Sequence, residues 1–251
     1  MSAKKTLIVI PARLAATRLP NKPLADICGK PMIVHVWEKA IKANVGPVIV
    51  ACGDQEIVEA IKSFGGEAIY TDPSLPSGTD RVKAAADVYD PQNKYDFIIN
   101  VQGDLPTLEP SLICEVLDPF QNTTVDIATL ATTISDLQEL SDSNVVKIAL
   151  SVNAEETIGR ALYFSRNPIP SGEGPHYHHI GLYAYRRHIL NQFVELAVDP
   201  IEAREKLEQL RALAAGMRID VKIIDTHAPF GVDTQSDLER AITIIGESYT
   251  L

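Results

Sequence analysis

Three basic side chains follow the first apolar segment of the chain. Leu7–Ile10 contains no polar residue and is rich in β-branched residues, which predicts a buried parallel strand. Arg13, Arg18 and Lys22 come next, in a loop interrupted by prolines. Ligands of open α/β sheets bind beyond the carboxyl ends of the strands, and Arg and Lys together suit a polyphosphate. The alternative is a surface loop whose charges are solvated.

The loop lacks the G-x-x-x-x-G-K-[ST] and G-x-G-x-x-G patterns, so it predicts neither a P-loop nor a dinucleotide fingerprint.

An acidic residue follows another apolar segment, in Asn100–Pro106 (NVQGDLP). Gln102 and Asp104 stand where a predicted strand ends, so both are expected to face the same crevice as the basic loop. Magnesium in nucleotide sites is held by one or two carboxylates together with phosphate oxygens and water. Asp104 is therefore a candidate Mg²⁺ ligand. The alternative is that it closes a turn or caps the next helix.

Two further segments combine polar residues with glycine. Phe230–Leu238 (FGVDTQSDL) places Asp233 one residue before Thr234, which is a candidate helix cap. Ser77–Arg81 (SGTDR) offers hydroxyl residues as helix caps and a glycine that allows close approach of the backbone. Helix capping is a sufficient explanation for either segment taken alone.

The apolar pattern predicts the elements that position these residues. Helices are expected to begin near Pro31, Asp54 and Asp80. The strands that alternate with them are Leu7–Ile10, Val48–Ala51, Ala68–Tyr70 and Asp96–Val101. The strands are almost entirely apolar, so the chain is expected to have an α/β fold with a Rossmann-like, mostly parallel sheet flanked by helices.

The pattern changes in the middle of the chain. Between about residues 125 and 187 four strands are expected with few helices between them. The sequence thus predicts a single α/β catalytic domain over residues 1–251, in which about 125–200 forms a smaller mixed-strand lobe. A long helix is expected from Pro200 to Gly216, with Asp199 as its N-cap. A strand at 219–224 and a helix at 234–245 complete the prediction.

Composition limits the possible partners. The 251 residues carry 33 acidic and 23 basic side chains, a formal net charge of −10, which argues against non-specific binding to nucleic acid or anionic membranes. The three cysteines form no C-x-x-C pair, which predicts neither a disulfide framework nor a zinc site. No signal peptide or membrane span is indicated, so a cytoplasmic protein is expected.

Taken together, these segments resemble the nucleotide-sugar cytidylyltransferases. The likeness is carried by PARLAATRLPNKPL at Pro11–Leu24 and GKPMI at Gly29–Ile33, and it recurs to about residue 240. The resemblance implies a nucleotide-diphospho-sugar transferase-like fold and a transferase activity. The reaction it implies is transfer of CMP from CTP to the anomeric hydroxyl of 3-deoxy-D-manno-octulosonate, with release of pyrophosphate, for lipopolysaccharide synthesis. It also implies Mg²⁺ as the cofactor and a homodimer.

The resemblance assigns a role to each matching residue. The catalytic residues it implies are Arg13, Lys22, Asp104 and Asp233, of which the two aspartates are the metal ligands. The nucleotide-binding residues it implies are Pro11, Ala12, Arg13, Arg18, Lys22, Ser77, Gly78, Thr79 and Arg81. The sugar-acid-binding residues it implies are Gln102, Arg166, His179, Tyr183, Glu208 and Gln209, drawn in part from the segments ALYFSR, HHIGLY and KLEQLR.

The chain departs from the family pattern at three positions. Ala16 replaces a common serine, Leu75 a common histidine and Leu105 a common glutamate. None of these changes removes a proposed metal ligand or phosphate-binding cation, but they leave the identity of the sugar acid open. The alternatives are a cytidylyltransferase for another acid, an acylneuraminate or an amino-octulosonate, and a non-catalytic nucleotide-binding module.

Overall fold

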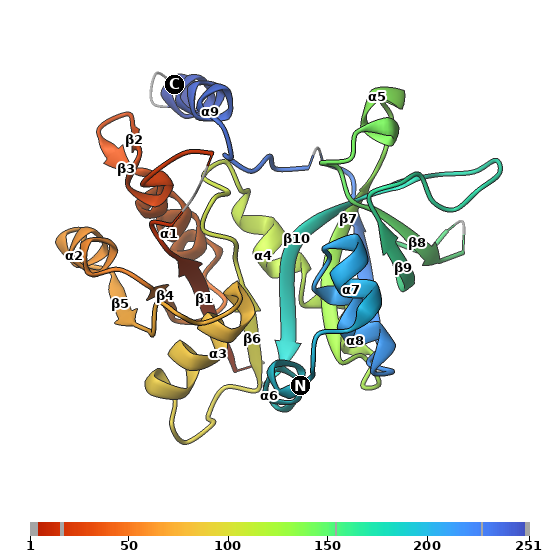
Figure 1. Ribbon diagram of the computed structural model, residues 1–251, viewed down its shortest axis with the longest axis horizontal. Coiled ribbons are helices and arrows are strands. Elements are labelled where there is room, and N and C mark those ends of the chain that lie inside the picture. Colours follow the sequence, from red (N-terminus) through yellow and green to blue (C-terminus); the bar gives the residue numbers. More distant parts are fainter. Residues whose placement is uncertain (1–4, 16–17, 154, 227, 249–251) are drawn as a thin grey trace. The chain divides into compact units, whose positions relative to one another are not determined.

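The computed structural model describes residues 5–15, 18–153, 155–226 and 228–248. The chain folds into two compact units (Figure 1). The first unit combines Met1–Cys114 with Pro229–Leu251, and the second is the continuous segment Glu115–Ala228. The second unit contains the region, about 125–200, in which the sequence predicted a smaller lobe. Ala16 lies outside the described residues.

The first unit contains a parallel sheet in the order β5-β4-β1-β6. These strands are Glu67–Tyr70, Val48–Cys52, Thr6–Ala12 and Phe97–Asn100, respectively. The central strand β1 is buried because its apolar residues are covered on both faces, and Leu7 to Ile10 have no exposed surface. Helices α1 (Met32–Ala43), α2 (Gln55–Ser63) and α3 (Gly78–Tyr89) contact the strands. The predicted parallel sheet with flanking helices is therefore confirmed.

Strand β1 continues past Pro11, although the sequence prediction ended it there. Pro11 lies opposite Ala51, and Ala12 opposite Cys52. On the other side of β1 the pairing stops at Val9, opposite Asn100, because β6 has ended. Alternation along the strand turns the nitrogen of Pro11 toward the side of β6, beyond the last residue of that strand. The missing N–H of Pro11 therefore breaks no hydrogen bond of the sheet.

The C-terminal segment completes the first unit. Helix α9 (Gln235–Ser248) contacts the short hairpin of β2 (Asp26–Ile27) and β3 (Lys30–Pro31). A buried apolar cluster joins the two segments and consists of Ile27, Met32, Val232, Leu238, Ala241 and Ile245. This cluster fixes the chain around residue 233 against the loop that precedes β2. Two short elements complete the unit, the 3-10 helix η1 (Lys22–Leu24) and α4 (Pro110–Glu115).

The second unit is built mainly from strands, as predicted. Its order is β10-β7-β11-β9-β8, and β8 also pairs with β10, so the strands close on themselves. Only β11 and β7 run parallel among these pairs. The strands in chain order are β7 (Ile127–Thr133), β8 (Lys147–Ser151), β9 (Ile158–Ser165), β10 (Tyr177–Arg186) and β11 (Ile219–Ile224). The helical elements before α7 are η2 (Asp118–Gln121), α5 (Leu137–Ser141) and α6 (Arg187–Glu195).

The long helix predicted over 200–216 is wrong, because the chain breaks it into α7 (Pro200–Glu205) and α8 (Gln209–Ala214). Asp199 is the N-cap of α7, as predicted. It forms a capping box with Glu202, in which the side chain of each residue accepts a hydrogen bond from the backbone amide of the other. The break occurs at Lys206, whose φ is +57°. Glu202 then forms a bidentate pair with Arg211 at 2.8 and 2.5 Å. In one continuous helix these two residues would lie about 13 Å apart along the axis, so the buried pair requires the break.

Within the described part of the chain, no helix is long and apolar enough to cross a membrane.

Lys147, the first residue of β8, is a fully buried cation. Its ammonium donates to the carbonyl oxygens of Asp142 (2.5 Å), Val145 (2.8 Å) and Arg166 (3.0 Å). A lysine has three donors, so each is used. These bonds hold the turn before β8 against the end of β9.

We expect Lys147→Met to lower the free energy of unfolding by about 2–4 kcal/mol, because three carbonyl oxygens lose their donor. Urea unfolding followed by circular dichroism measures the change. Lys222→Met is the matched control, because Lys222 donates to Thr157 on the surface at 3.1 Å and is expected to cost less than about 1 kcal/mol. Equal losses in the two variants would contradict the role assigned to Lys147.

Candidate active site

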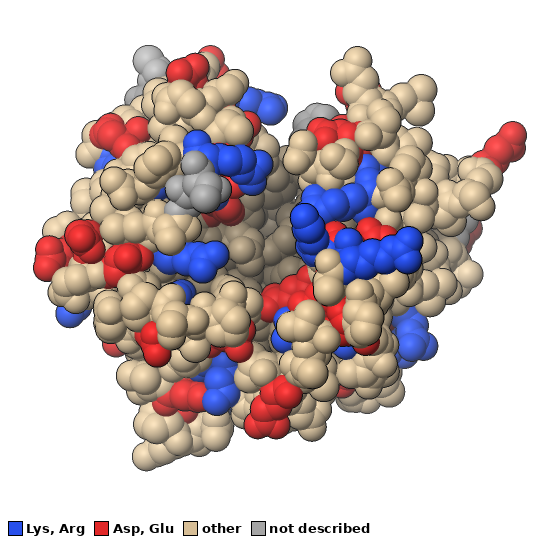
Figure 2. Space-filling view, in the orientation of Figure 1, with Lys and Arg blue, Asp and Glu red and all other residues tan. Residues whose placement is uncertain are grey.

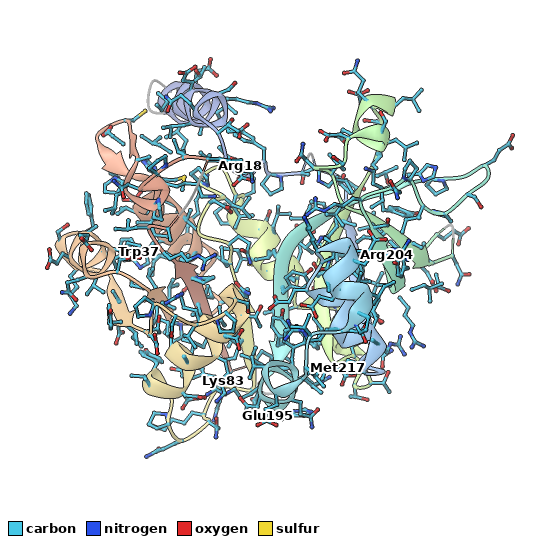
Figure 3. The ribbon with its side chains drawn as sticks, in the orientation of Figure 1. Arg18, Trp37, Lys83, Glu195, Arg204 and Met217 are labelled. Carbon is cyan, nitrogen blue, oxygen red and sulfur yellow. The ribbon has the colours of Figure 1, made fainter. Side chains whose placement is uncertain are left out.

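Four charged side chains from three distant segments meet in the first unit. The Lys22 ammonium lies 2.7 Å from Asp104 Oδ2 and 2.9 Å from Asp233 Oδ1. The Arg18 guanidinium lies 2.9 Å from Asp233 Oδ2, beside the chain that enters α9 (Figure 3). We call these four residues the Lys22 cluster. The sequence predicted each of them as a site residue, and the fold brings them together.

Local backbone geometry places each member of the cluster. Asp104 follows Gly103, where an added Cβ would lie 2.7 Å from the carbonyl oxygen of Pro11, so only glycine fits without a shift. The amide of Val232 donates to the carbonyl oxygen of Asp104 at 3.0 Å and so ties the Asp233 segment to the end of β6. Lys22 begins η1, directly after Asn21 in the left-handed region.

Asp237 was not among the predicted site residues. Its carboxylate accepts from the amides of Asp233 (3.1 Å) and Thr234 (2.8 Å) and from the Thr234 hydroxyl (2.8 Å). Burial raises the pKa of Asp237, but these hydrogen bonds outweigh it and hold the pKa below its usual value. Asp237 therefore orders the turn that carries Asp233. An acid three residues after a candidate cap was the available signal.

The carboxylates of the Lys22 cluster stabilise the charged form of Lys22. Burial lowers the pKa of Lys22, but Asp104 and Asp233 outweigh it and leave the pKa above its ordinary value. Lys22 is therefore a cation at neutral pH. Two carboxylates that converge on one cation suit Mg²⁺, which takes its remaining ligands from phosphate and water oxygens. No group of three or more His, Cys, Asp or Glu side chains that could hold a metal ion is found among the described residues. The candidate metal ligands in the cluster are therefore the two carboxylates.

The residues predicted to bind the nucleotide base also gather in the first unit. Ser77 caps α3 by accepting from the Asp80 amide at 3.2 Å. Gly78 approaches the Pro11 ring, because a Cβ added there would lie 3.7 Å from Pro11 Cγ. Thr79 is buried. Gly78 thus lies beside β1, and the nucleotide-binding role of Ser77, Gly78 and Thr79 stays a prediction.

Arg81 is placed differently from an exposed base-reading side chain. It is 2% exposed, and its guanidinium donates to the Thr71 hydroxyl and to the carbonyl oxygens of Asp72 (3.3 Å) and Pro73 (3.5 Å). It also packs on Gly53, where a Cβ would lie 2.9 Å from Arg81 Nη1. Arg81 therefore holds the backbone of residues 71–73. Arg13 is exposed. Burial of Arg81, together with the positive charge of Arg13, lowers the pKa of Arg81.

Asp54 has a role that the sequence did not reveal. Helix α2 begins after Asp54, as predicted, but the Asp54 carboxylate makes no cap bond and instead accepts from the Leu14 amide at 2.7 Å. It therefore shapes the loop after β1. Cys52 is buried in β4, and burial raises the pKa of its thiol to about 12. This thiol is not a nucleophile at neutral pH.

The residues predicted to bind a sugar acid divide between the units. In the second unit, the His179 ring lies 5.3 Å from Tyr183 and 5.2 Å from Phe164, measured between centroids. Burial, Tyr185 and Glu208 raise the pKa of Tyr183 well above its ordinary value. Gln209 is buried at the start of α8. The structure thus groups His179 and Tyr183 and places Glu208 within electrostatic reach of Tyr183.

Arg166 and Gln102 each form a hydrogen bond within their own unit. Arg166 follows β9, and its guanidinium donates to the carbonyl oxygen of Ser143 at 2.8 Å. Gln102 belongs to the first unit and donates to Asn100 Oδ1 at 3.2 Å. Each therefore has a local partner that fixes its side chain.

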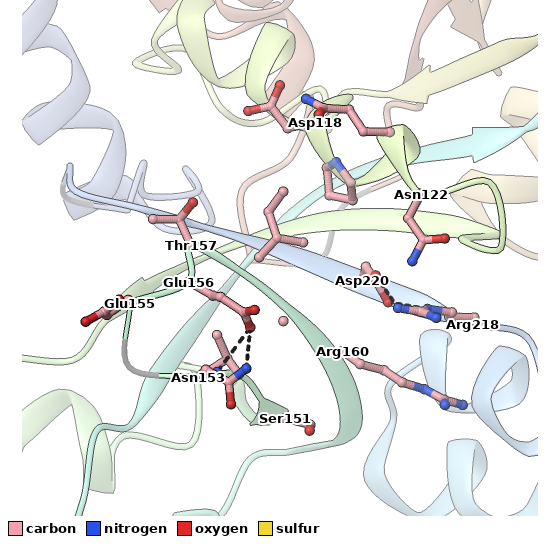
Figure 4. Close-up of a pocket in the computed structure, with 15 residues that line it drawn as sticks. Asp118, Asn122, Ser151, Asn153, Glu155, Glu156, Thr157, Arg160, Arg218 and Asp220 are labelled. Atoms are coloured by element: carbon pink, nitrogen blue, oxygen red, sulfur yellow. Dashed lines mark hydrogen bonds and ion pairs between the residues drawn. The ribbon is translucent and has the colours of Figure 1, made fainter.

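A separate hollow of about 760 Å³ opens in the second unit, between η2, β9 and β11 (Figure 4). Arg218 pairs with its neighbour Asp220 in the lining at 2.8 and 2.9 Å, and Glu156 accepts from the Asn153 amide group at 3.0 Å. These polar groups satisfy one another, and none of the predicted site residues lines the hollow. On the face shown in Figure 2, acidic and basic side chains are likewise interspersed.

Comparison with known proteins shows the family of the chain. A family model described as cytidylyltransferase matches residues 7–219, which defines the chain as a nucleotidyltransferase of the cytidylyltransferase class. A 3-deoxy-manno-octulosonate cytidylyltransferase of Paramagnetospirillum magneticum is 54% identical over 98% of this chain and 99% of its own length. One of Brucella ovis is 53% identical over the full length of both. A solved structure of CMP:2-keto-3-deoxy-manno-octonic acid synthetase complexed with CTP has a TM-score of 0.88 and 37% identity, covering 97% of this chain and 99% of that one. The chain belongs to the 3-deoxy-manno-octulosonate cytidylyltransferase family.

His179 predicts an acid-dependent loss of stability. Burial lowers the pKa of His179 to about 3, with a smaller contribution from His178, whereas histidine in an unfolded chain titrates near about 6.5. Between these values the unfolded chain binds a proton that the folded chain does not, so stability falls as pH falls. We expect the loss between pH 7 and pH 5 to be smaller in His179→Gln than in wild type, by up to about 2 kcal/mol. Urea unfolding at both pH values measures it, and identical losses would contradict the assignment.

Proposed function

We propose that this protein transfers CMP from CTP to the anomeric hydroxyl of 3-deoxy-D-manno-octulosonate and releases pyrophosphate. The observation that carries the proposal is the Lys22 cluster, which joins two cations and two carboxylates at the end of the parallel sheet. The close relatives support the choice of substrates, because they are named for this sugar acid along nearly the whole length of the chain. The product is an activated sugar acid suited to lipopolysaccharide synthesis.

The cations of the basic loop would bind the triphosphate. Lys22 and Arg18 are paired with carboxylates, and the phosphate oxygens would become additional partners for both. Arg13 is exposed on the same loop and would add a third positive charge. Phosphoryl transfer depends mainly on positioning and charge neutralisation, so no nucleophilic side chain is required.

We propose that Asp104 and Asp233 hold Mg²⁺. Their convergence on the single Lys22 ammonium supports this assignment, because the same pair of carboxylates can face another cation. When bound, Mg²⁺ supplies neutralisation of phosphate charge and lowers the pKa of a coordinated hydroxyl. The role of the protein is to fix the two carboxylates, through Gly103 and through the hydrogen bonds that Asp237 accepts.

The sugar acid would bind to groups of complementary chemistry. Arg166 is suited to its carboxylate, because guanidinium donors match a carboxylate in pairs. His179, Tyr183, Glu208 and Gln209 carry the polar atoms suited to its hydroxyl groups. Ser77, Gly78, Thr79 and Arg81 would shape the cytosine pocket, the last through the backbone of residues 71–73.

We also propose that the enzyme is a cytoplasmic homodimer. CTP and reduced cysteines are both found in the cytoplasm, and Cys28, Cys52 and Cys114 form no disulfide. For the dimer, Leu162 points outward from the middle of β9 with 58% of its surface exposed. An exposed leucine on a strand surface is suited to burial against a second copy.

The central test is pyrophosphate release from CTP and Mg²⁺ with 3-deoxy-manno-octulosonate or N-acetylneuraminate as the acceptor. We expect turnover with the octulosonate alone, and a loss of kcat of about 100-fold or more in Asp104→Asn and in Asp233→Asn. Asp87→Asn is the matched control, because Asp87 pairs with Lys83 on the surface of α3. Turnover with neither acid would refute the substrate, and full activity in both site variants would refute the metal ligands.

The dimer is tested by light scattering after size exclusion. Wild type is expected to have twice the mass of the chain, and Leu162→Glu the mass of one copy, because a buried charge opposes association. Leu137→Glu is the control, since Leu137 is 81% exposed on the short helix α5 and is expected to remain dimeric. A monomeric wild type would refute the proposal.

A further inference from the structure

Strand β10 is irregular where it passes Thr129 of β7. Ile180 lies opposite Leu130, and the next pair is Tyr183 opposite Thr129, so Gly181 and Leu182 are extra residues. Residues four apart on a regular strand are about 13 Å apart. The bulge shortens this span and brings the rings of His179 and Tyr183 to 5.3 Å between centroids. The arrangement of both rings therefore depends on the bulge.

The hydroxyl of Thr129 occupies the centre of the bulge. Its Oγ1 lies 2.8 Å from the carbonyl oxygen of Leu182, 3.1 Å from that of Ile180 and 3.0 Å from His179 Nε2. Thr129 has no exposed surface, and both bulge carbonyls belong to buried residues. These three polar atoms thus share one hydroxyl away from solvent.

A hydroxyl group has one proton to donate and two lone pairs that accept. A carbonyl oxygen can only accept, so the single Thr129 proton is directed to the two carbonyl oxygens. The third neighbour, His179 Nε2, must then donate to the hydroxyl oxygen. With the opposite tautomer, either the Nε2 lone pair would face the hydroxyl lone pairs, or the hydroxyl proton would turn to Nε2 and be lost to both carbonyl oxygens, and each outcome is costly in a buried site.

We infer that Thr129 is a positioning residue that fixes His179 as its Nε2–H tautomer and leaves Nδ1 as a hydrogen-bond acceptor for a hydroxyl group of the sugar acid. Burial keeps the ring neutral, since the pKa of His179 lies at about 3. Within the described part of the chain Nδ1 makes no hydrogen bond, and the side chain retains 9% exposure.

This inference rests on the proposed function for the identity of its ligand. It also predicts which group of that ligand can bind to the ring. A neutral ring that presents only a lone pair can accept from a hydroxyl group but repels a carboxylate. His179 would therefore reject the acid group of the substrate and direct it to a cation. The ring and Arg166 would together distinguish the two ends of a sugar acid, one by accepting and the other by donating.

The tautomer is measured by long-range ¹H–¹⁵N correlation spectra of protein labelled with ¹⁵N-histidine, with His179 assigned from its absence in His179→Gln. We expect the Nε2–H pattern in wild type and in Thr129→Ser, which keeps the hydroxyl. In Thr129→Val the pattern is expected to change to a mixture of tautomers. An Nδ1–H pattern or a charged ring in wild type at pH 7 would overturn the inference, whether or not the valine variant folds.

The kinetic test separates substrate positioning from a merely structural role. We expect Thr129→Val to raise KM for 3-deoxy-manno-octulosonate about tenfold, the loss of one hydrogen bond, with KM for CTP changed less than about twofold. Thr129→Ser is expected to restore the wild-type value. Thr132→Val is the matched control, because its hydroxyl on the same strand donates to the Thr226 carbonyl at 2.9 Å. Equal effects on both substrates would overturn the positioning role.

The two experiments distinguish this inference from the proposed function. If wild type shows no turnover with the octulosonate, the proposed function fails, while the tautomer of His179 is still read directly from the spectrum. If turnover is present and the spectrum shows Nδ1–H, the function stands and the inference fails. Addition of the sugar acid with CTP is expected to shift the Nδ1 resonance, and an unchanged resonance would overturn the acceptor role.

Discussion

The contact of the Lys22 ammonium with Asp104 and Asp233 is the interaction on which the first unit depends. It joins the loop after β1, the end of β6 and the segment before α9 at one point. Two carboxylates brought together without a cation would repel each other and raise their pKa values. Lys22 removes that repulsion, since its own pKa is held above the ordinary value by the two carboxylates. Lys22 thus allows the two carboxylates to lie close together.

The charge of the site differs from that of the whole protein. The chain has a formal net charge of −10, which repels a polyanion at long range. In the Lys22 cluster Arg18 and Lys22 balance the two carboxylates, and Arg13 adds a positive charge on the same loop. Binding of a triphosphate therefore relies on short-range geometry rather than on long-range attraction. Rigid placement by Gly103 and by Asp237 supplies that geometry.

The sequence was sufficient to predict what depends on local pattern. The apolar segments gave the parallel strands of the first unit, and the change of pattern near residue 125 indicated the mixed-strand unit. Asp104 and Asp233 were identified because each follows a strand or precedes a helix within a recognisable motif. The position of Asp104 near the basic loop was expected from the strand ends, whereas the role of Asp233 was expected only through the resemblance to a known family. The direct contact of both carboxylates with Lys22 is long-range and was not predicted.

What the sequence could not predict depends on contacts between distant residues. Pro11 appeared to end a strand because the end of β6 is not visible from the local pattern. The helix break at Lys206 follows from the pairing of Glu202 with Arg211, nine residues away. Thr129 has no local feature that distinguishes it from other strand threonines, because its importance arises from a bulge in a different strand.

The discontinuity of the first unit has a consequence for the order of folding. The second unit is one continuous segment, whereas the first needs residues from both sides of it. Ile27 and Met32 are synthesised before the second unit, and their cover, which includes Leu238 and Ile245, is synthesised after it. A nascent chain on the ribosome therefore displays an uncovered apolar surface until that cover has been made, which is the kind of surface that chaperones bind. Catalytic competence and completion of the core are then reached in the same late step.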